Sequence, residues 1–142
     1  MKKKQAALAA ALALGLSAPI AMAADPAREA ILAAYAAQAK AEDTAFAAFS
    51  AERGRSLYMG PHQGGNPETN ACAACHTGNP AATGRHRKTG RGIEPMAVSV
   101  NPARFTDPDE VEKQFGRDCK NVLGRACTAR EKGDFITFLS AQ

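Results

Sequence analysis

The sequence predicts an all-α fold in which helices wrap around one covalently attached group and are joined by long Gly/Pro-rich loops. No segment shows the sustained two-residue alternation of a half-exposed strand, and apolar residues near both ends recur at helical spacing. The middle, residues 59–106, holds seven Gly and five Pro and few large aliphatic side chains. Loops this long are uncommon inside a compact domain. We therefore expect a large cofactor to fill part of the core.

Two helices are predicted in the first half of the chain. The first covers roughly residues 26–39 and carries an apolar stripe at helical spacing. Ser50 is a suitable N-cap for a second, short helix, Ala51–Met59. The side chains expected to pack inward are Ile31, Leu32, Tyr35, Leu57 and Tyr58.

Two more helices are predicted near the C-terminus. Asp107 is an N-cap followed by Pro108 at the first helical position, and this helix should stop at Gly116. Thr128 and Glu131 form a capping box that starts the last helix. The apolar side chains of the last helix are Phe135, Ile136, Phe138 and Leu139.

The first 23 residues have the composition of a cleaved bacterial signal peptide. Three lysines precede an apolar run of 11 residues, and Ala21-Met22-Ala23 suits signal peptidase. That run is too short to cross about 30 Å of hydrocarbon at roughly 1.5 Å per residue. We therefore expect a single periplasmic domain, residues 24–142, with no membrane span after cleavage. Removing the three lysines leaves 15 basic against 14 acidic side chains.

The most specific motif is Cys72-Ala73-Ala74-Cys75-His76, the C-x-x-C-H signature of c-type haem. Two thiols on one helical turn can form thioethers to the two vinyl groups, and His76 then lies beneath the ring as an iron ligand. A thioredoxin-like redox pair would need a preceding strand, and a zinc site would need further ligands. The motif therefore predicts one covalent haem c.

Cys119 and Cys127 are the remaining cysteines, and in an exported protein such a pair most often forms a disulfide. From spacing alone, the bridge either holds a loop against the open face of the haem or is a plain stability bridge.

The chain resembles the sphaeroides haem protein family of class I cytochromes c. The resemblance rests on the C-x-x-C-H motif, Ala51-Glu52-Arg53-Gly54-Arg55, the run 101–107, and the segments 116–119 and 123–128. It implies class I helices crossing near the motif, Cys72 and Cys75 as haem thioethers, His76 as proximal ligand, and a Cys119–Cys127 disulfide. It also implies electron transfer, with dioxygen or nitric oxide binding as an alternative.

The sixth iron ligand is where the sequence departs from the family. The best-known member has an Asn before the first disulfide cysteine, and this chain has Asp118. A carboxylate is a hard anion, so we expect Asp118 either to bind ferric iron weakly or to leave the distal face open. Met96 is the alternative thioether ligand, with haem-edge packing as its other interpretation. The weaker candidates are His62, His86, Lys120 and Asn121.

The basic run 85–91 is the only cluster of positive charge left after cleavage. It is a solvated loop, a partner for haem propionates, or a docking patch for an acidic redox protein. No aromatic residues interleave with it, so nucleic-acid binding is not expected.

The leading functional hypothesis is an electron carrier, not an enzyme, that exchanges single electrons with a redox partner such as another cytochrome. The second is a haem protein that binds dioxygen or nitric oxide. The third, from another class, is a thiol–disulfide oxidoreductase that uses Cys72 and Cys75.

Overall fold

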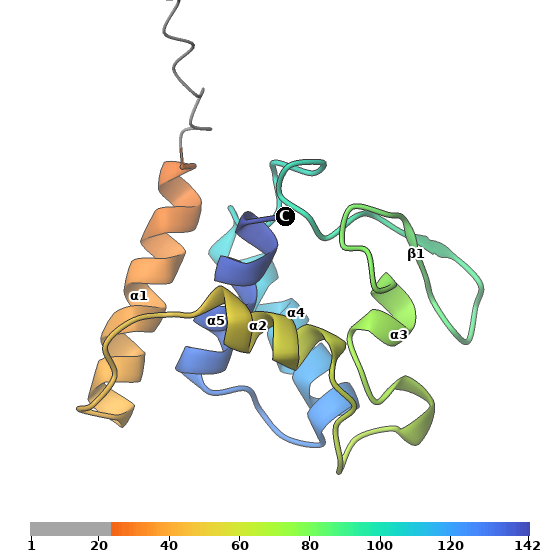
Figure 1. Cartoon of the computed structure of the whole chain (residues 1–142), viewed down its shortest axis with the longest axis horizontal. Helices are drawn as coiled ribbons and strands as arrows, with labels where there is room; N and C mark the ends of the chain where they lie inside the picture. The colour runs from red at the N-terminus through yellow and green to blue at the C-terminus, as the bar shows by residue number, and fades with distance from the viewer. Residues whose placement is uncertain (1–23) are drawn as a thin grey trace, which may run out of the picture.

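The computed structural model describes residues 24–142, in which helices are the dominant secondary structure and are joined by long loops (Figure 1). The signal-peptide prediction for residues 1–23 lies outside the described residues. The all-α prediction is confirmed. The described helices are α1 (Pro26–Glu42), α2 (Ala51–Met59), the 3₁₀ turn η1 (Pro67–Thr69), α3 (Ala73–His76), α4 (Pro108–Leu123) and α5 (Ala129–Ser140).

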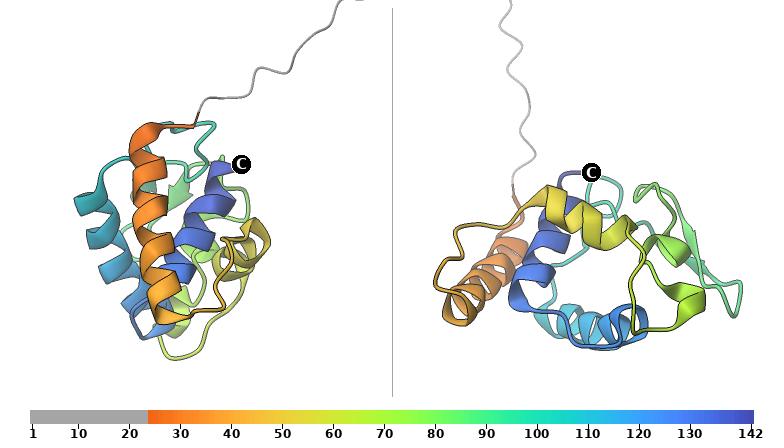
Figure 2. Two further views of the ribbon diagram at one scale, coloured as in Figure 1. Left: turned by 90° about the vertical axis from the view of Figure 1, so that its left-hand side faces the viewer. Right: turned by 60° about the horizontal axis from the view of Figure 1, so that its bottom comes forward.

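Helix α1 covers one side of α5, as the two views in Figure 2 show. Asp25 caps its N-terminus by accepting a hydrogen bond from the Ala27 N–H at 2.9 Å. The helix runs to Glu42, three residues beyond the predicted end at residue 39. Arg28 is buried on α1, and its guanidinium donates to the carbonyl oxygens of Pro102 (2.6 Å) and Arg104 (2.9 Å). These bonds tie α1 to the loop that leads into α4.

Helices α2 and α5 cross at Gly54, and α2 has the predicted bounds. A Cβ atom at Gly54 would lie 2.0 Å from the Asp134 carbonyl oxygen, so only glycine permits this approach. Asp134 is buried on α5 and accepts hydrogen bonds from the Ser50 N–H (2.7 Å) and Arg53 Nε (2.7 Å). The crossing is therefore fixed by backbone contact and by a paired, hydrogen-bonded carboxylate.

The predicted end of the third helix at Gly116 is wrong, because α4 continues to Leu123. Gly116 lies inside the helix with no atom within 4 Å of a Cβ at that position. A glycine in a helix interior costs only about 1 kcal/mol relative to alanine. The helix ends instead at Gly124, which adopts φ 72° as a left-handed cap. The buried side chains that extend the apolar stripe are Val111, Phe115, Cys119, Val122 and Leu123.

The predicted capping box of α5 is present. Thr128 Oγ1 accepts from the Glu131 N–H at 3.2 Å, and the Glu131 carboxylate accepts from the Thr128 N–H at 2.9 Å. Arg125 also donates to Glu131 at 2.7 Å. The hydrogen bonds from Arg125, with smaller help from Thr128, lower the pKa of Glu131 although burial opposes the shift.

We expect Glu131→Gln to lower the free energy of unfolding by about 1 kcal/mol at neutral pH, as lost helix caps do. Because the folded-state pKa is lowered, this stabilisation is present above the unfolded value of about 4.3 and is lost as pH falls through the folded value. Denaturant unfolding of the two holoproteins from pH 7 to pH 3 should show that the unfolding free energies of the wild type and the Glu131→Gln variant become equal in acid. Glu29→Gln, on the exposed first turn of α1, is the control. A difference that stays constant down to pH 3 would contradict the prediction.

The Gly/Pro-rich middle of the chain carries η1, α3 and one small hairpin. Strands β1 (Gly84–Arg85) and β2 (Gly92–Ile93) pair antiparallel, with Gly84 opposite Ile93. Two residues per strand are too few to produce the alternation by which strands are predicted, which is why the sequence did not reveal them. Figure 1 shows α3 and β1 on the side of α2 and α4 opposite to α1. Within residues 24–142, no helix combines the length and hydropathy needed to cross a membrane.

Candidate haem-attachment site

The C-x-x-C-H motif forms the single turn of α3. Cys72 precedes the helix, and both Cys72 and Cys75 are free, partly buried thiols. Burial raises the pKa of Cys72 to about 12, and the Asp118 carboxylate adds to the shift. A redox-active C-x-x-C pair needs a lowered thiol pKa, because the thiolate is the nucleophile. The environment of Cys72 is therefore opposite to that of a thiol–disulfide oxidoreductase.

His76 ends α3 with its ring turned into the protein. Its Nδ1 atom is buried and has no hydrogen-bond partner among the described residues. Burial lowers the pKa of His76, and the Arg104 and Arg117 guanidinium groups add to the fall while Asp118 opposes it. The imidazole is therefore favoured in its neutral form, which is the form that binds metals.

Tyr58 fixes the backbone at the end of α3, a role that sequence reasoning did not assign to it. Its hydroxyl donates to the carbonyl oxygens of His76 (3.0 Å) and Thr77 (2.9 Å). The Tyr58 side chain is fully buried, between α2 and the α5 aromatics Phe135 and Phe138. The residue that places the motif thus belongs to the helical core.

Gly84 is a second positioning residue that the sequence alone did not single out. A Cβ atom there would lie 2.4 Å from the Cys75 carbonyl oxygen, so the backbone of β1 rests directly on α3. Its glycine identity was the available signal, but one glycine among twelve does not show which contact requires it.

Asp118, the predicted distal candidate, lies on α4 with its carboxylate held by the preceding residue. Arg117 Nε lies 2.6 Å from Oδ1 and Arg117 Nη2 lies 3.0 Å from Oδ2. The side chain is 45% exposed. The same carboxylate shifts the pKa values of both Cys72 and His76. The fold therefore brings Asp118 into the electrostatic neighbourhood of the motif, although its oxygens already have a partner.

The disulfide between Cys119 and Cys127 is present, with a Cα–Cα distance of 5.6 Å. It joins the last turns of α4 to the segment just before α5. Because Cys119 follows Asp118 directly, the bridge restrains the part of α4 that carries the distal candidate.

Met96 is buried in the hydrophobic core. Its N–H donates to the Pro80 carbonyl oxygen at 2.8 Å, which ties it to the segment that follows His76. This environment supports the packing interpretation of Met96.

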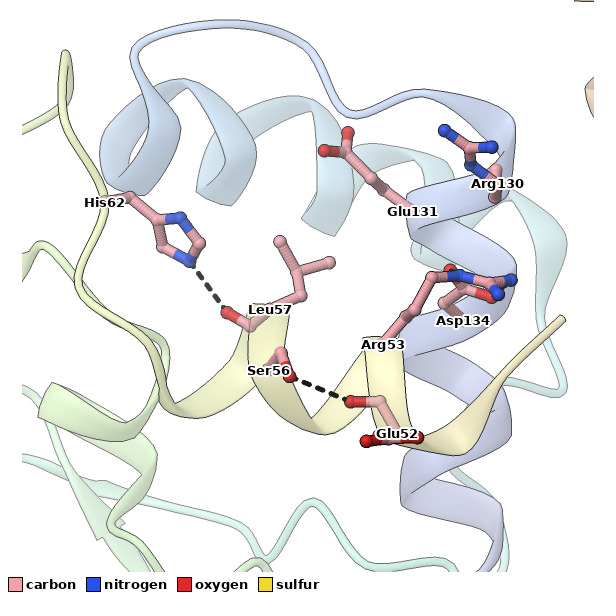
Figure 3. A pocket seen from close by; sticks show the side chains of 8 residues that line it. All are labelled: Glu52, Arg53, Ser56, Leu57, His62, Arg130, Glu131 and Asp134. Carbon is pink, nitrogen blue, oxygen red and sulfur yellow. Dashed lines mark hydrogen bonds and ion pairs between the residues drawn. The ribbon is translucent and has the colours of Figure 1, made fainter. Parts of the chain in front are cut away.

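The two other histidines, His62 and His86, lie outside the C-x-x-C-H motif. His62 lines a cavity of ≈480 Å³ between α2 and α5, with Nε2 directed at the Leu57 carbonyl oxygen 2.8 Å away (Figure 3). Apart from His62, that cavity contains none of the residues predicted to hold the haem. His86 is exposed on the hairpin, and its Nδ1 accepts from the Thr89 N–H at 3.2 Å.

The donor set fits a covalent haem. Two free thiols flank one helical turn, and a neutral imidazole with an unpartnered buried nitrogen follows directly. In residues 24–142 no group of three or more His, Cys, Asp and Glu side chains is arranged to hold a metal ion, unlike a zinc site. An all-α fold built around this motif defines the class of c-type cytochromes.

Comparisons with known proteins agree with this class. Residues 44–139 match the family described as "Domain of unknown function (DUF1924)". The chain is 46% identical over 101 residues to "Cytochrome c-type protein SHP" of Cereibacter sphaeroides, across 71% of this chain and 78% of that protein. It is 49% identical over 69 residues to "Cytochrome c''" of Methylophilus methylotrophus, across 49% of this chain and 48% of that protein.

Two solved structures are similar throughout. Oxidized SHP, described as an oxygen-binding cytochrome c, gives a TM-score of 0.74 at 42% identity, covering 81% of this chain and 96% of that one. Oxidized cytochrome c'' from Methylophilus methylotrophus gives a TM-score of 0.72 at 35% identity, covering 82% of this chain and 94% of that one. The chain belongs to this family of sphaeroides haem protein-like monohaem cytochromes. Its cofactor is covalently attached haem c.

Proposed function

We propose that the chain is a periplasmic carrier of single electrons, with haem held by Cys72, Cys75 and His76. The observation that carries the assignment of these residues is the unpartnered, buried Nδ1 of His76 beside two free thiols. When bound, the haem supplies an iron that changes between ferric and ferrous states. The partner is a redox protein such as another cytochrome, and the working chain is residues 24–142 after removal of residues 1–23.

The protein's own residues provide position and shielding in this proposal. Tyr58 holds the carbonyls at the end of α3, and burial keeps the His76 imidazole neutral. Phe115 and Phe135 pack edge to face at 5.6 Å within the core, which keeps water from the apolar interior.

A potentiometric titration of the holoprotein tests the carrier role. We expect one reversible one-electron transition per chain, followed by the visible absorption spectrum. Mass spectrometry of the mature protein from the periplasmic fraction should give a chain beginning at Ala24 or Asp25 with one haem added. A transition of more than one electron, or a chain retained with residues 1–23, would contradict the corresponding part of the proposal.

The second candidate function is binding of a small diatomic ligand, dioxygen or nitric oxide, on the side of the site next to Asp118. Arg117 occupies both oxygens of the Asp118 carboxylate, so this side chain is poorly free to act as a strong metal ligand. The similar SHP structure is of an oxygen-binding cytochrome c. We infer that the distal side in this chain is open or only weakly closed by Asp118.

Electron paramagnetic resonance of the oxidised holoprotein tests this inference. We expect a high-spin ferric signal whose field positions change in Asp118→Ala, and a reduced spectrum that changes when carbon monoxide is added. Asp109→Ala, which removes an exposed carboxylate from the first turn of the same helix, should leave the signal unchanged. A low-spin signal that neither substitution alters would assign the sixth position to another side chain such as Met96 or a histidine. A reduced spectrum unaffected by carbon monoxide would refute an open face.

A further inference from the structure

The positive charge of the described chain is concentrated on the β1–β2 hairpin. Residues 84–93 contain four basic side chains and no acidic one. The rest of residues 24–142 has 11 basic against 14 acidic side chains. A nearly neutral protein therefore has a positive hairpin on a net negative body. The four basic side chains, here called the hairpin cations, are Arg85, Arg87, Lys88 and Arg91.

The hairpin cations are not used inside the described part of the molecule. Its six ion pairs all involve other residues, and among residues 24–142 none of the four contacts a carboxylate. Arg85 donates to the Gly90 carbonyl oxygen at 2.8 Å, a neutral acceptor within the hairpin. All four side chains are exposed. Within the described polypeptide their charge is therefore unpaired.

The hairpin holds these charges in a defined shape. The His86 N–H donates to the Arg91 carbonyl oxygen and the Gly90 N–H to the His86 carbonyl oxygen, both at 2.8 Å. Gly90 has φ 70°, which closes the turn at a residue without a side-chain penalty. A tied hairpin presents the cations with less conformational freedom to lose on binding than a loose loop would.

The hairpin also lies directly against the haem-attachment motif. The backbone of Gly84 rests on the Cys75 carbonyl oxygen. Beside this contact, the hairpin and the motif line a shared cavity of ≈440 Å³. Figure 1 shows β1 next to α3, with the hairpin extending away from the helices. The residues that line this cavity are Ala74, Cys75, Thr77, Arg85, His86 and Arg87.

We propose that the hairpin 84–93 is the docking surface for an acidic redox partner protein, placed so that docking brings the partner next to Cys75. The proposal rests on the proposed electron-carrier function. Electrostatic complementarity mainly raises the association rate and sets the orientation of the two proteins. The net negative charge of the rest of the protein repels an acidic partner, so the partner approaches through the hairpin. Binding in a membrane surface would need apolar side chains to insert, and the hairpin offers only Ile93. The chemistry therefore favours a protein partner.

The test compares two variants that lose the same charge. Arg87→Gln/Lys88→Gln removes two hairpin cations that make no side-chain hydrogen bond within the described chain. Arg55→Gln/Lys113→Gln removes two exposed cations from α2 and α4, one of them in a surface pair with Glu110. The probe is a reduced ferredoxin with a strongly acidic surface, and stopped-flow absorbance gives the second-order rate constant for reduction of the ferric holoprotein. The rate of reduction by uncharged hydroquinone is the control, because this small molecule reduces the same site without electrostatic docking.

At about 10 mM ionic strength, where charges act over roughly 30 Å, we expect the hairpin variant to react with ferredoxin about tenfold more slowly than the wild type. The control variant should slow less than threefold, and the difference should disappear at about 0.5 M salt. Equal losses in both variants would show an effect of net charge alone and overturn the docking surface. Loss of binding to anionic vesicles in the hairpin variant, with unchanged ferredoxin kinetics, would overturn it in favour of a membrane. If hydroquinone also fails to reduce the wild type, the electron-carrier function itself fails.

Discussion

Cys72→Ala/Cys75→Ala is expected to abolish covalent haem attachment completely. Cys72 caps the single turn of α3 and Cys75 lies within it, and no other described cysteine is free, since Cys119 and Cys127 are joined. Without the thioethers, only His76 among the motif's residues can hold the cofactor. Mass spectrometry of the denatured protein should show the mass of the polypeptide alone. The pyridine haemochrome spectrum in alkali should lack the absorption band position that is typical of haem c. Haem that survives denaturation in this variant would show that the attachment residues are others.

Cys119→Ala/Cys127→Ala is the matched control, because it also removes two cysteines. We expect it to keep the covalent haem while its free energy of unfolding falls by about 2–3 kcal/mol, the size expected for closing a short loop. Electron paramagnetic resonance of the same variant then reports whether the bridge also restrains the end of α4 that carries Asp118.

Gly54→Ala is expected to produce a large loss of stability from a single added methyl group. The new Cβ would lie 2.0 Å from the Asp134 carbonyl oxygen and 2.8 Å from Phe138 Cβ, so α2 and α5 must separate. Overpacking of this kind costs about 3 kcal/mol or more. Denaturant unfolding of the holoprotein measures the loss. If the unfolding free energy stays within 1 kcal/mol of the wild-type value, the two helices can move apart to admit a methyl group, and the prediction is wrong.

Gly116→Ala is the control for the helix propensity of alanine itself. Gly116 is helical and has open space around it, so a methyl group there meets no atom within 4 Å. We expect a gain of about 1 kcal/mol, because alanine is a better helix former than glycine. A loss of unfolding free energy at Gly54 and a gain at Gly116 would show that the effect at Gly54 comes from packing and not from the helix propensity of alanine.

The parts of the fold that depend on local chemistry were predicted correctly. Ser50 and Asp107 cap the helices as expected, and the capping box formed by Thr128 and Glu131 is present. The end of α4 was predicted wrongly because Gly116 has the residue type of a helix end without the left-handed conformation. Of these two glycines, only Gly124, just over two turns later, adopts that conformation. Residue type alone cannot distinguish these two glycines.

The candidate site was predictable where it depends on spacing and not where it depends on packing. The C-x-x-C-H pattern is contiguous, so the sequence itself places Cys72, Cys75 and His76 together. Tyr58 reaches the motif from 18 residues earlier, and that contact depends on the crossing of α2 and α5. The ion pair between Arg117 and Asp118 similarly depends on side-chain conformation, which the order of residues does not determine.

The hydroxyl of Tyr58 has a consequence for the speed of electron transfer. Moving the end of α3 would require breaking buried hydrogen bonds to His76 and Thr77, which are costly to leave unmade. In the proposed carrier role, we therefore expect the backbone at the end of α3 to shift little when the charge of the haem iron changes. Small nuclear displacement means low reorganisation energy, so the barrier to each electron exchange is small. The helical crossing at Gly54, through Tyr58, would thereby affect the rate of a redox reaction in which neither residue takes part.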